Sequence, residues 1–323
     1  MSQALIARVR GAASARTVTM SGSIGLAVSY GCLSVFVVAA LLRSVRIARL
    51  PLHLRWELAP VPKEKGRGHY GGSYLEEFEW WRKPREKSTV AELVYILKEI
   101  VFLKALREHN PMLWWSSYPF HLGLYVLATA AGVIVLSAAC TVLGVPSPGW
   151  GVMRTAVPWL AGAAYAMGAV GALGLLGNRI LDPKLRTMTT PVAFFNLVLL
   201  LAVFATGLSA LLTEGGFIQH AVAYASALLT ARPVPAMPGP LAVHVGVSLL
   251  FLAYVPFSQM MHPVAKYFTY HQVRWDDRPM EAGSSMEREV QSLLQQPVTW
   301  AAPHVGADGT KSWVDVASGG PSK

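Results

Sequence analysis

The sequence predicts an all-α integral membrane protein with five transmembrane helices, the N-terminus outside, and a long cytoplasmic loop between helices 1 and 2. Of the 323 residues, 53% are hydrophobic and 14% are charged, and the mean hydropathy is +0.39. These values are too apolar for an ordinary soluble domain. The apolar residues also gather in long runs, and the basic residues gather on one side of them. These three observations carry the fold prediction.

Five apolar runs are long enough to cross a hydrocarbon core of about 30 Å, which takes about 20 residues. They cover residues 23–42, 120–143, 157–176, 191–212 and 241–261. The first run follows three arginines, as a signal peptide would, but its apolar stretch is longer than that of a signal peptide and leads directly into further arginines. We therefore expect a retained first span.

The basic residues give the orientation, because Lys and Arg are kept on the cytoplasmic side during insertion. With the N-terminus outside, 23 Lys and Arg residues fall in cytoplasmic segments and five fall outside. This bias accounts for the formal charge of +10 without a nucleic-acid partner, and neither a zinc-finger spacing nor an RNA-binding aromatic motif is present.

The chain then divides into four expected segments. They are the N-terminal segment with the first span (1–43), a cytoplasmic loop (44–117), a core of the other four spans (118–263) and a cytoplasmic tail (264–323). In the loop, apolar residues from Leu93 to Leu103 repeat at helical spacing, which predicts a helix in the headgroup region, and this helix would also suit a peripheral subunit. Beyond Arg278 the tail is rich in Gly, Ser and Pro, so we expect extended chain or chain ordered by a partner.

The two cysteines restrict the chemistry. Cys32 and Cys140 both lie inside apolar runs, which excludes a disulfide framework, a four-thiolate zinc site and an iron–sulfur cluster held by this chain alone. Any redox chemistry must therefore come from another group.

Three of the nine histidines lie at the ends of predicted spans. His121 opens the second span, and His244 and His262 lie at the two ends of the fifth. An ionisable side chain in a span is costly and indicates a function. The 18 residues between His244 and His262 make five helical turns, about 27 Å, so both imidazoles are expected on one face of a single helix. His262 is then expected at the same depth as His121, near the cytoplasmic side.

Two neutral imidazoles on facing helices at equal depth are the axial ligands of six-coordinate haem b. We therefore predict that His121 and His262 hold a haem iron. The alternative is that these histidines are hydrogen-bonded to carbonyls or lipid headgroups at helix ends.

Three segments identify a related family. SYPFHLGLYVL, NRILDPKLRTMTT and HVGVSLLFLAYVPFSQMMH resemble the cytochrome b (gamma) subunit family of respiratory nitrate reductase, over about residues 120–262. The loop HLRWELAPVPKEKG and the tail AKYFTYHQVRWDD are more similar to the branch that accompanies heterodisulfide-reductase-like iron–sulfur proteins. The resemblance implies a five-helix, quinone-linked respiratory-chain protein of the cytoplasmic (inner) membrane of a prokaryote.

In that family four histidines hold two haems, and the resemblance pairs His121 with His262 for the haem nearer the cytoplasm. The family's second ligand on the second helix lies ten residues further on, where this sequence has Ala131. His244 therefore lacks its expected partner. Three alternatives remain: the outer haem is absent, it is five-coordinate, or a residue such as His220, from the loop between spans four and five, completes it. We expect one haem b, with a second haem or a quinone site as the alternative roles of His244.

The sequence thus predicts a membrane cytochrome b subunit that transfers electrons between the (mena)quinone pool and a cytoplasmic iron–sulfur subunit resembling heterodisulfide reductase. It would be an oxidoreductase only as a subunit of that complex, with no complete active site and no assigned catalytic residue on this chain. The direction of electron flow stays open. The alternative is a non-redox membrane scaffold that anchors a peripheral complex, but a scaffold gives no reason for the matched histidines.

Overall fold

The computed structural model describes residues 22–49, 89–146, 149–270, 282–302, 304 and 306–319. The chain divides into two compact units, which we describe separately. The first unit consists of residues 1–40 and 97–260, and the second of residues 41–96 and 261–323. Most of the predicted cytoplasmic loop, residues 50–88, lies outside the described residues.

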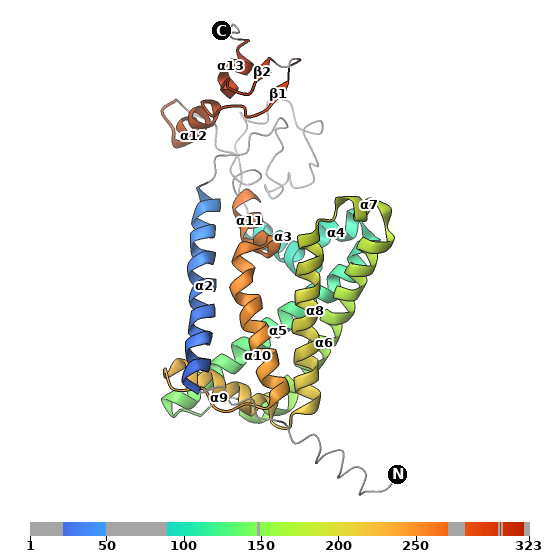
Figure 1. Cartoon of the computed structure of the whole chain (residues 1–323), viewed down its shortest axis with the longest axis vertical. Coiled ribbons are helices and arrows are strands. Elements are labelled where there is room, and N and C mark those ends of the chain that lie inside the picture. Colours follow the sequence, from blue (N-terminus) through green and yellow to red (C-terminus); the bar gives the residue numbers. More distant parts are fainter. Residues whose placement is uncertain are drawn as a thin grey trace, which may run out of the picture. The chain divides into compact units, whose positions relative to one another are not determined.

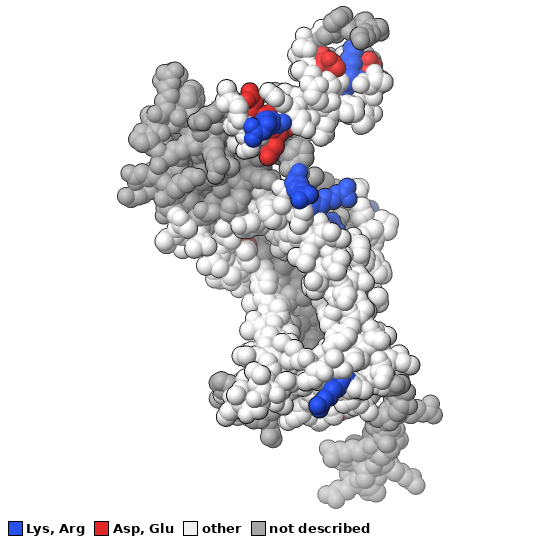
Figure 2. All heavy atoms as spheres, turned by 90° about the vertical axis from the view of Figure 1, so that its left-hand side faces the viewer, with Lys and Arg blue, Asp and Glu red and all other residues white. Residues whose placement is uncertain are grey.

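Five of the described helices are long and apolar enough to cross a membrane, which confirms the predicted fold class (Figure 1). They are α2 (Gly22–Ala48), α5 (Pro111–Leu143), α6 (Trp150–Leu181), α8 (Pro191–Thr213) and the segment Gly239–Phe257, which consists of α10 (Gly239–Tyr254) and the 3₁₀ turn that follows it. Figure 2 shows that the described surface along these helices is nearly free of charge over most of its length, with Lys and Arg near the helix ends. Such a surface suits the hydrocarbon of a bilayer.

Shorter elements connect and follow the spans. They are α3 (Thr89–Phe102), α4 (Lys104–His109), α7 (Pro183–Met188), α9 (Phe217–Leu229), η3 (Val255–Phe257), η4 (Gln259–Met261), α11 (His262–Tyr270), α12 (Ser285–Leu294), β1 (Ala301–Ala302), β2 (Ala307–Asp308) and α13 (Trp313–Ala317). Helix α3 confirms the helix that the loop sequence predicts. Its exposed face carries large apolar side chains, including Leu93 and Leu97.

Four spans of the first unit pack in a row, α5 on α6, α6 on α8, and α8 on α10. Glycines bring α5 and α6 close together. A Cβ at Gly123 would lie 2.7 Å from the Ala164 carbonyl oxygen, and one at Gly171 would lie 2.5 Å from the Phe120 nitrogen. Small residues allow such close backbone approach between membrane helices. The order of these contacts puts α5 at one end of the row and α10 at the other.

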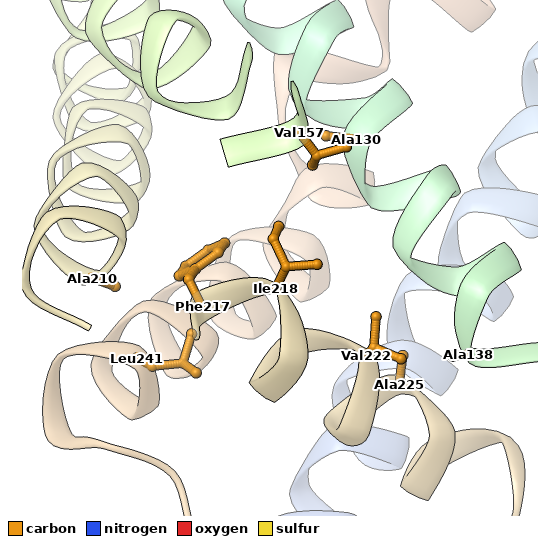
Figure 3. Packing of buried hydrophobic residues seen from close by; sticks show 9 residues of the cluster. All are labelled: Ala130, Ala138, Val157, Ala210, Phe217, Ile218, Val222, Ala225 and Leu241. Carbon is orange, nitrogen blue, oxygen red and sulfur yellow. The ribbon is translucent and has the colours of Figure 1, made fainter. Parts of the chain in front are cut away.

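Helix α9 closes one end of the first unit, and we call this the α9 end. Its apolar residues join side chains from four spans in one buried cluster (Figure 3). The cluster consists of Ala130, Ala138, Val157, Ala210, Phe217, Ile218, Val222, Ala225 and Leu241. Helix α2 is attached here as well, because the Tyr224 hydroxyl lies 2.6 Å from Ser29 Oγ and donates to it, while Ser29 donates to the Gly25 carbonyl.

The structure corrects the description of His220 as a loop residue, because it lies on α9. The buried residues Phe217, Ile218, Val222 and Ala225 recur at helical spacing. The segment is too short to span a membrane, which is why hydropathy alone reads it as a connection.

The fifth span is not one helix, which contradicts the sequence argument for His244 and His262. The α-helix ends at Tyr254, two 3₁₀ turns follow, and His262 begins α11. Pro256 accounts for the break, since its ring has no N–H to donate and clashes with the preceding turn. Ser258 then adopts an extended conformation, with φ −111° and ψ 176°. The two histidines therefore do not share one helix face over five turns.

The second span begins earlier than the sequence predicts. Helix α5 starts at Pro111 rather than at residue 120, and the Asn110 side chain caps it by accepting a hydrogen bond of 3.0 Å from the Leu113 N–H. His121 therefore lies about three turns inside the helix instead of opening it. Pro119 does not end the helix, as is common for proline in membrane helices.

The tail also differs from the expectation of extended chain. Residues 285–317 form α12, a short antiparallel strand pair and α13. Serine residues, which contribute to the linker-like composition of the tail, cap its two helices. Ser284 accepts from the Glu287 N–H, and Ser312 forms a capping box with Asp315. Val298, with 1% of its surface exposed, is the buried centre of this region.

Candidate functional site

His121 lies on α5 in an orientation that suits metal binding. Its Nδ1 atom is 2.7 Å from the Ser117 carbonyl oxygen and 3.3 Å from Ser117 Oγ. A carbonyl only accepts, so Nδ1 carries the proton and the lone pair is on Nε2. Histidine ligands of metals commonly have this second hydrogen bond, which fixes the tautomer and the ring orientation. His121 therefore fits an axial ligand that binds through Nε2.

Packing on both sides of His121 sets its position. The preceding residue, Phe120, is 6% exposed and packs edge-on against Phe204, with ring centroids 5.8 Å apart. Helix α3 is tied to α5 before and after His121. Trp114 Nε1 donates to the Phe102 carbonyl at 2.8 Å, and the Tyr125 hydroxyl donates to the Ile100 carbonyl at 2.9 Å. The imidazole is therefore presented from a fixed stretch of helix.

His262 is exposed at the first residue of α11 and belongs to the second unit. His121 belongs to the first unit. Their pairing stays a prediction from the sequence.

His244 lies in the first unit among hydroxyl groups of two neighbouring helices. Its Nε2 atom is 3.0 Å from the Tyr165 hydroxyl of α6, and its Nδ1 atom is 3.2 Å from Thr206 Oγ1 of α8. Thr206 donates its own proton to the Ala202 carbonyl at 2.7 Å. It therefore accepts the Nδ1–H of His244, and Nε2 accepts the Tyr165 O–H. We call this set the His244 cluster.

Gly207 makes room for the His244 cluster. A Cβ at this position would lie 2.3 Å from Tyr165 Cε1 and 2.8 Å from His244 Cε1, distances that real atoms do not reach. Tyr165 is itself 6% exposed. The half-buried imidazole of His244 thus has a hydrogen-bond partner for each ring nitrogen.

The sequence does not reveal Tyr165, Thr206 or Gly207 as partners of His244. They lie on α6 and α8, and no local spacing links residues on different helices. The sequence signal that could have found Tyr165 and Thr206 is that each is a polar residue inside an apolar run. Many residues that do not contact a histidine have the same property, so the signal does not single these two out.

The role of His244 as a ligand of a second haem stays a prediction from the sequence, and both of its ring nitrogens have other partners in this structure. An axial ligand needs the lone pair of Nε2, which here accepts the Tyr165 proton. Ala131, at the position of the missing family ligand, has no ligating atom and is exposed on α5. His220 is half-buried on α9 and, within the described residues of the chain, hydrogen bonds to neither His244 nor Tyr165. No three or more His, Cys, Asp or Glu side chains gather as a metal site among the described residues.

Comparison with known families gives one finding. The model of a family described as the nitrate reductase gamma subunit matches residues 106–276, which is more than half of the chain and includes His121, His244 and His262. A comparison with curated proteins finds no match.

Proposed function

The chain belongs to the nitrate reductase gamma subunit family, and we propose that it transfers electrons between the quinone pool and a cytoplasmic iron–sulfur subunit. The family consists of haem-containing membrane cytochromes b of quinone-linked oxidoreductase complexes. The observation that carries the proposal is the hydrogen bond from His121 to the Ser117 carbonyl, because it fixes the ring and the tautomer in which Nε2 is the metal-binding atom.

We assign His121 and His262 as the axial ligands of one haem b. The haem supplies one-electron transfer between the quinone and the partner subunit. The chain supplies two imidazoles, the Ser117 carbonyl that orients one of them, and the rigid packing of Phe120. The assignment of His262 rests on the sequence, since both histidines lie within the residues that the family model matches.

One haem per chain is the stoichiometry that we propose. His244 already has hydrogen-bond partners for both ring nitrogens, and Ala131 offers no ligand. His244 remains a candidate for a hydrogen bond to quinone. This role requires the Tyr165 hydroxyl to rotate away from Nε2 and the quinone to provide a donor in its reduced form.

We propose that the partner is an iron–sulfur protein resembling heterodisulfide reductase, because this chain is similar to the branch of the family that accompanies such proteins. It rests on the loop and tail sequences, including Trp80, Trp81 and Trp275, which lie outside the described residues. Tryptophan and arginine are enriched at the energetic centres of interfaces. A pull-down of the tagged chain from solubilised membranes should recover a cysteine-rich iron–sulfur protein. Recovery of the chain only with copies of itself would contradict the partner.

The test of the function is a reduced-minus-oxidised spectrum of the purified chain, which should show a b-type alpha band. His121→Ala and His262→Ala should each remove the low-spin haem, because each takes away one of two axial ligands. His220→Ala is the matched control and should keep the band. A full low-spin spectrum in both ligand variants would end the assignment. A chain without any haem in wild type would favour the scaffold alternative.

A further inference from the structure

A pocket at the α9 end of the first unit has no role in the proposed function. Its volume is about 700 Å³, and it is lined by the C-terminal end of α5, by α9 and by the segment that follows α9. The lining combines apolar side chains with five polar or charged side chains. The lining includes Val142, Gln219, Ala223, Ser226, Thr230 and Arg232.

The backbone after α9 holds Arg232 at this pocket. The Arg232 N–H donates to the Ala227 carbonyl at 3.0 Å, and the Thr230 N–H donates to the Ser226 carbonyl at 3.1 Å. Ala231 between them has φ 52°, in the left-handed region that disfavours a residue with a Cβ. Pro233 follows directly and restricts the chain further. The position of Arg232 is therefore fixed by the main chain.

The charge of Arg232 has no counterpart among the described residues of the α9 end. Among the described residues of the α9 end, the acidic side chain is that of Glu214, and it forms no ion pair with Arg232. The Arg232 side chain is exposed. Ser226 also lines the pocket, and its hydroxyl oxygen is buried without a hydrogen-bond partner. The pocket thus offers a cation and an unused hydroxyl, together with the Gln219 amide.

We propose that this pocket binds the phosphodiester headgroup of an anionic phospholipid. A guanidinium matches the oxygens of a phosphate in charge and in its forked geometry. Gln219 and Ser226 add neutral donors, and Val142 and Ala223 provide an apolar wall for the glycerol and the first methylene groups. The C-terminal end of α5 lines the pocket, and the ends of membrane-spanning helices lie near the headgroup layer. A free phosphate would use the same polar groups and leave the apolar wall without a contact.

The test measures lipid binding to the purified full chain. After delipidation, native mass spectrometry follows binding of phosphatidylglycerol, with phosphatidylcholine and inorganic phosphate as separate probes. Wild type should retain phosphatidylglycerol in preference to phosphatidylcholine. Arg232→Gln should weaken its binding about tenfold or more, the factor expected for one charge-assisted hydrogen bond. Arg232→Lys keeps the charge and should recover some of the binding.

Two further variants separate the pocket from the charge. Ala223→Trp fills the pocket without changing any charge and should weaken lipid binding by a similar factor. Arg186→Gln removes an exposed arginine at the opposite end of the first unit and should have no effect. Thermal unfolding checks that each variant is folded.

Three results would overturn the proposal. These are equal loss of binding in Arg186→Gln and Arg232→Gln, unchanged binding in Ala223→Trp, and displacement of the lipid by millimolar inorganic phosphate. The last result would mark a free-phosphate site instead. None of these outcomes depends on haem or on electron transfer, so the test is independent of the proposed function.

Discussion

At the scale of single residues, two histidines of the same unit donate the same ring proton to different kinds of partner. His121 gives its Nδ1 proton to the Ser117 carbonyl of its own helix, and the lone pair stays on Nε2. His244 gives its Nδ1 proton to Thr206, and its Nε2 lone pair is already used by Tyr165. The partner of each imidazole, rather than its place in the sequence, therefore separates a candidate ligand from a hydrogen-bonded core residue.

Tyr165→Phe tests the role of the His244 cluster. The variant leaves a buried Nε2 lone pair without a donor, so we expect the free energy of unfolding to fall by about 1–3 kcal/mol. The haem content per chain should not change, because one haem is proposed and His244 does not hold it. Unfolding by SDS titration checks the stability, and haem extraction with protein quantitation checks the haem content.

His244→Ala serves as the companion variant. It should also keep one haem per chain. A wild type with two haems, one of which is lost in His244→Ala, would overturn the one-haem proposal and make His220 the next residue to substitute.

Asp308 gives a pH prediction in the second unit. Hydrogen bonds from the Thr310 N–H, the Thr310 hydroxyl and the Lys311 N–H lower the pKa of this carboxyl from 3.8 to about 2. Because the pKa in the folded state lies below the ordinary value, the carboxylate stabilises this turn above pH 3.8. The contribution is lost as the pH falls through about 2. A carboxyl NMR titration should find the low midpoint, and Thr310→Ala should raise it. A midpoint of 3.8 in wild type would show that the turn does not form.

At the scale of elements, the contact between α5 and α6 decides how His121 is presented. Gly171→Ala places a Cβ 2.5 Å from the Phe120 nitrogen, so the helices must separate next to His121. We expect a loss of about 1–3 kcal/mol in the free energy of unfolding, as for other overpacked contacts, with a weaker low-spin haem band.

Gly177→Ala is the matched control on the same helix. Nothing lies within 4 Å of a Cβ at this position, so this variant should be neutral or more stable by about 0.5–1 kcal/mol, the usual gain of alanine over glycine in a helix. Equal effects of the two substitutions would show that helix propensity, rather than close packing, determines the result.

At the scale of the whole molecule, the orientation predicted from the basic residues can be tested at the two ends of α8. Met188 and Gly215 are exposed on opposite sides of this span. With the N-terminus outside, a membrane-impermeant maleimide should label Gly215→Cys in spheroplasts and should label Met188→Cys only after permeabilisation. Both variants are made in a chain whose Cys32 and Cys140 are replaced by alanine. The reverse labelling pattern would invert the proposed topology.

The sequence by itself determined the membrane class, the five spans, the helix at residues 89–102 and the family motifs. These features are local, because hydropathy summed over about 20 consecutive residues measures the cost of placing that segment in lipid, whatever surrounds it. His121, His244 and His262 stand out for the same reason, since each is a polar group at the edge of an apolar run.

Only the tertiary structure decided the break after Tyr254, the helix that carries His220, and the partners of His244. The break depends on whether packing compensates for a proline, and membrane helices differ in this, as Pro119 inside α5 and Pro256 after α10 show. Tyr165 and Thr206 meet His244 because α6, α8 and α10 pack in one particular register. That register is set by side-chain contacts between helices, such as the fit of Tyr165 over Gly207, which no spacing along a single helix contains.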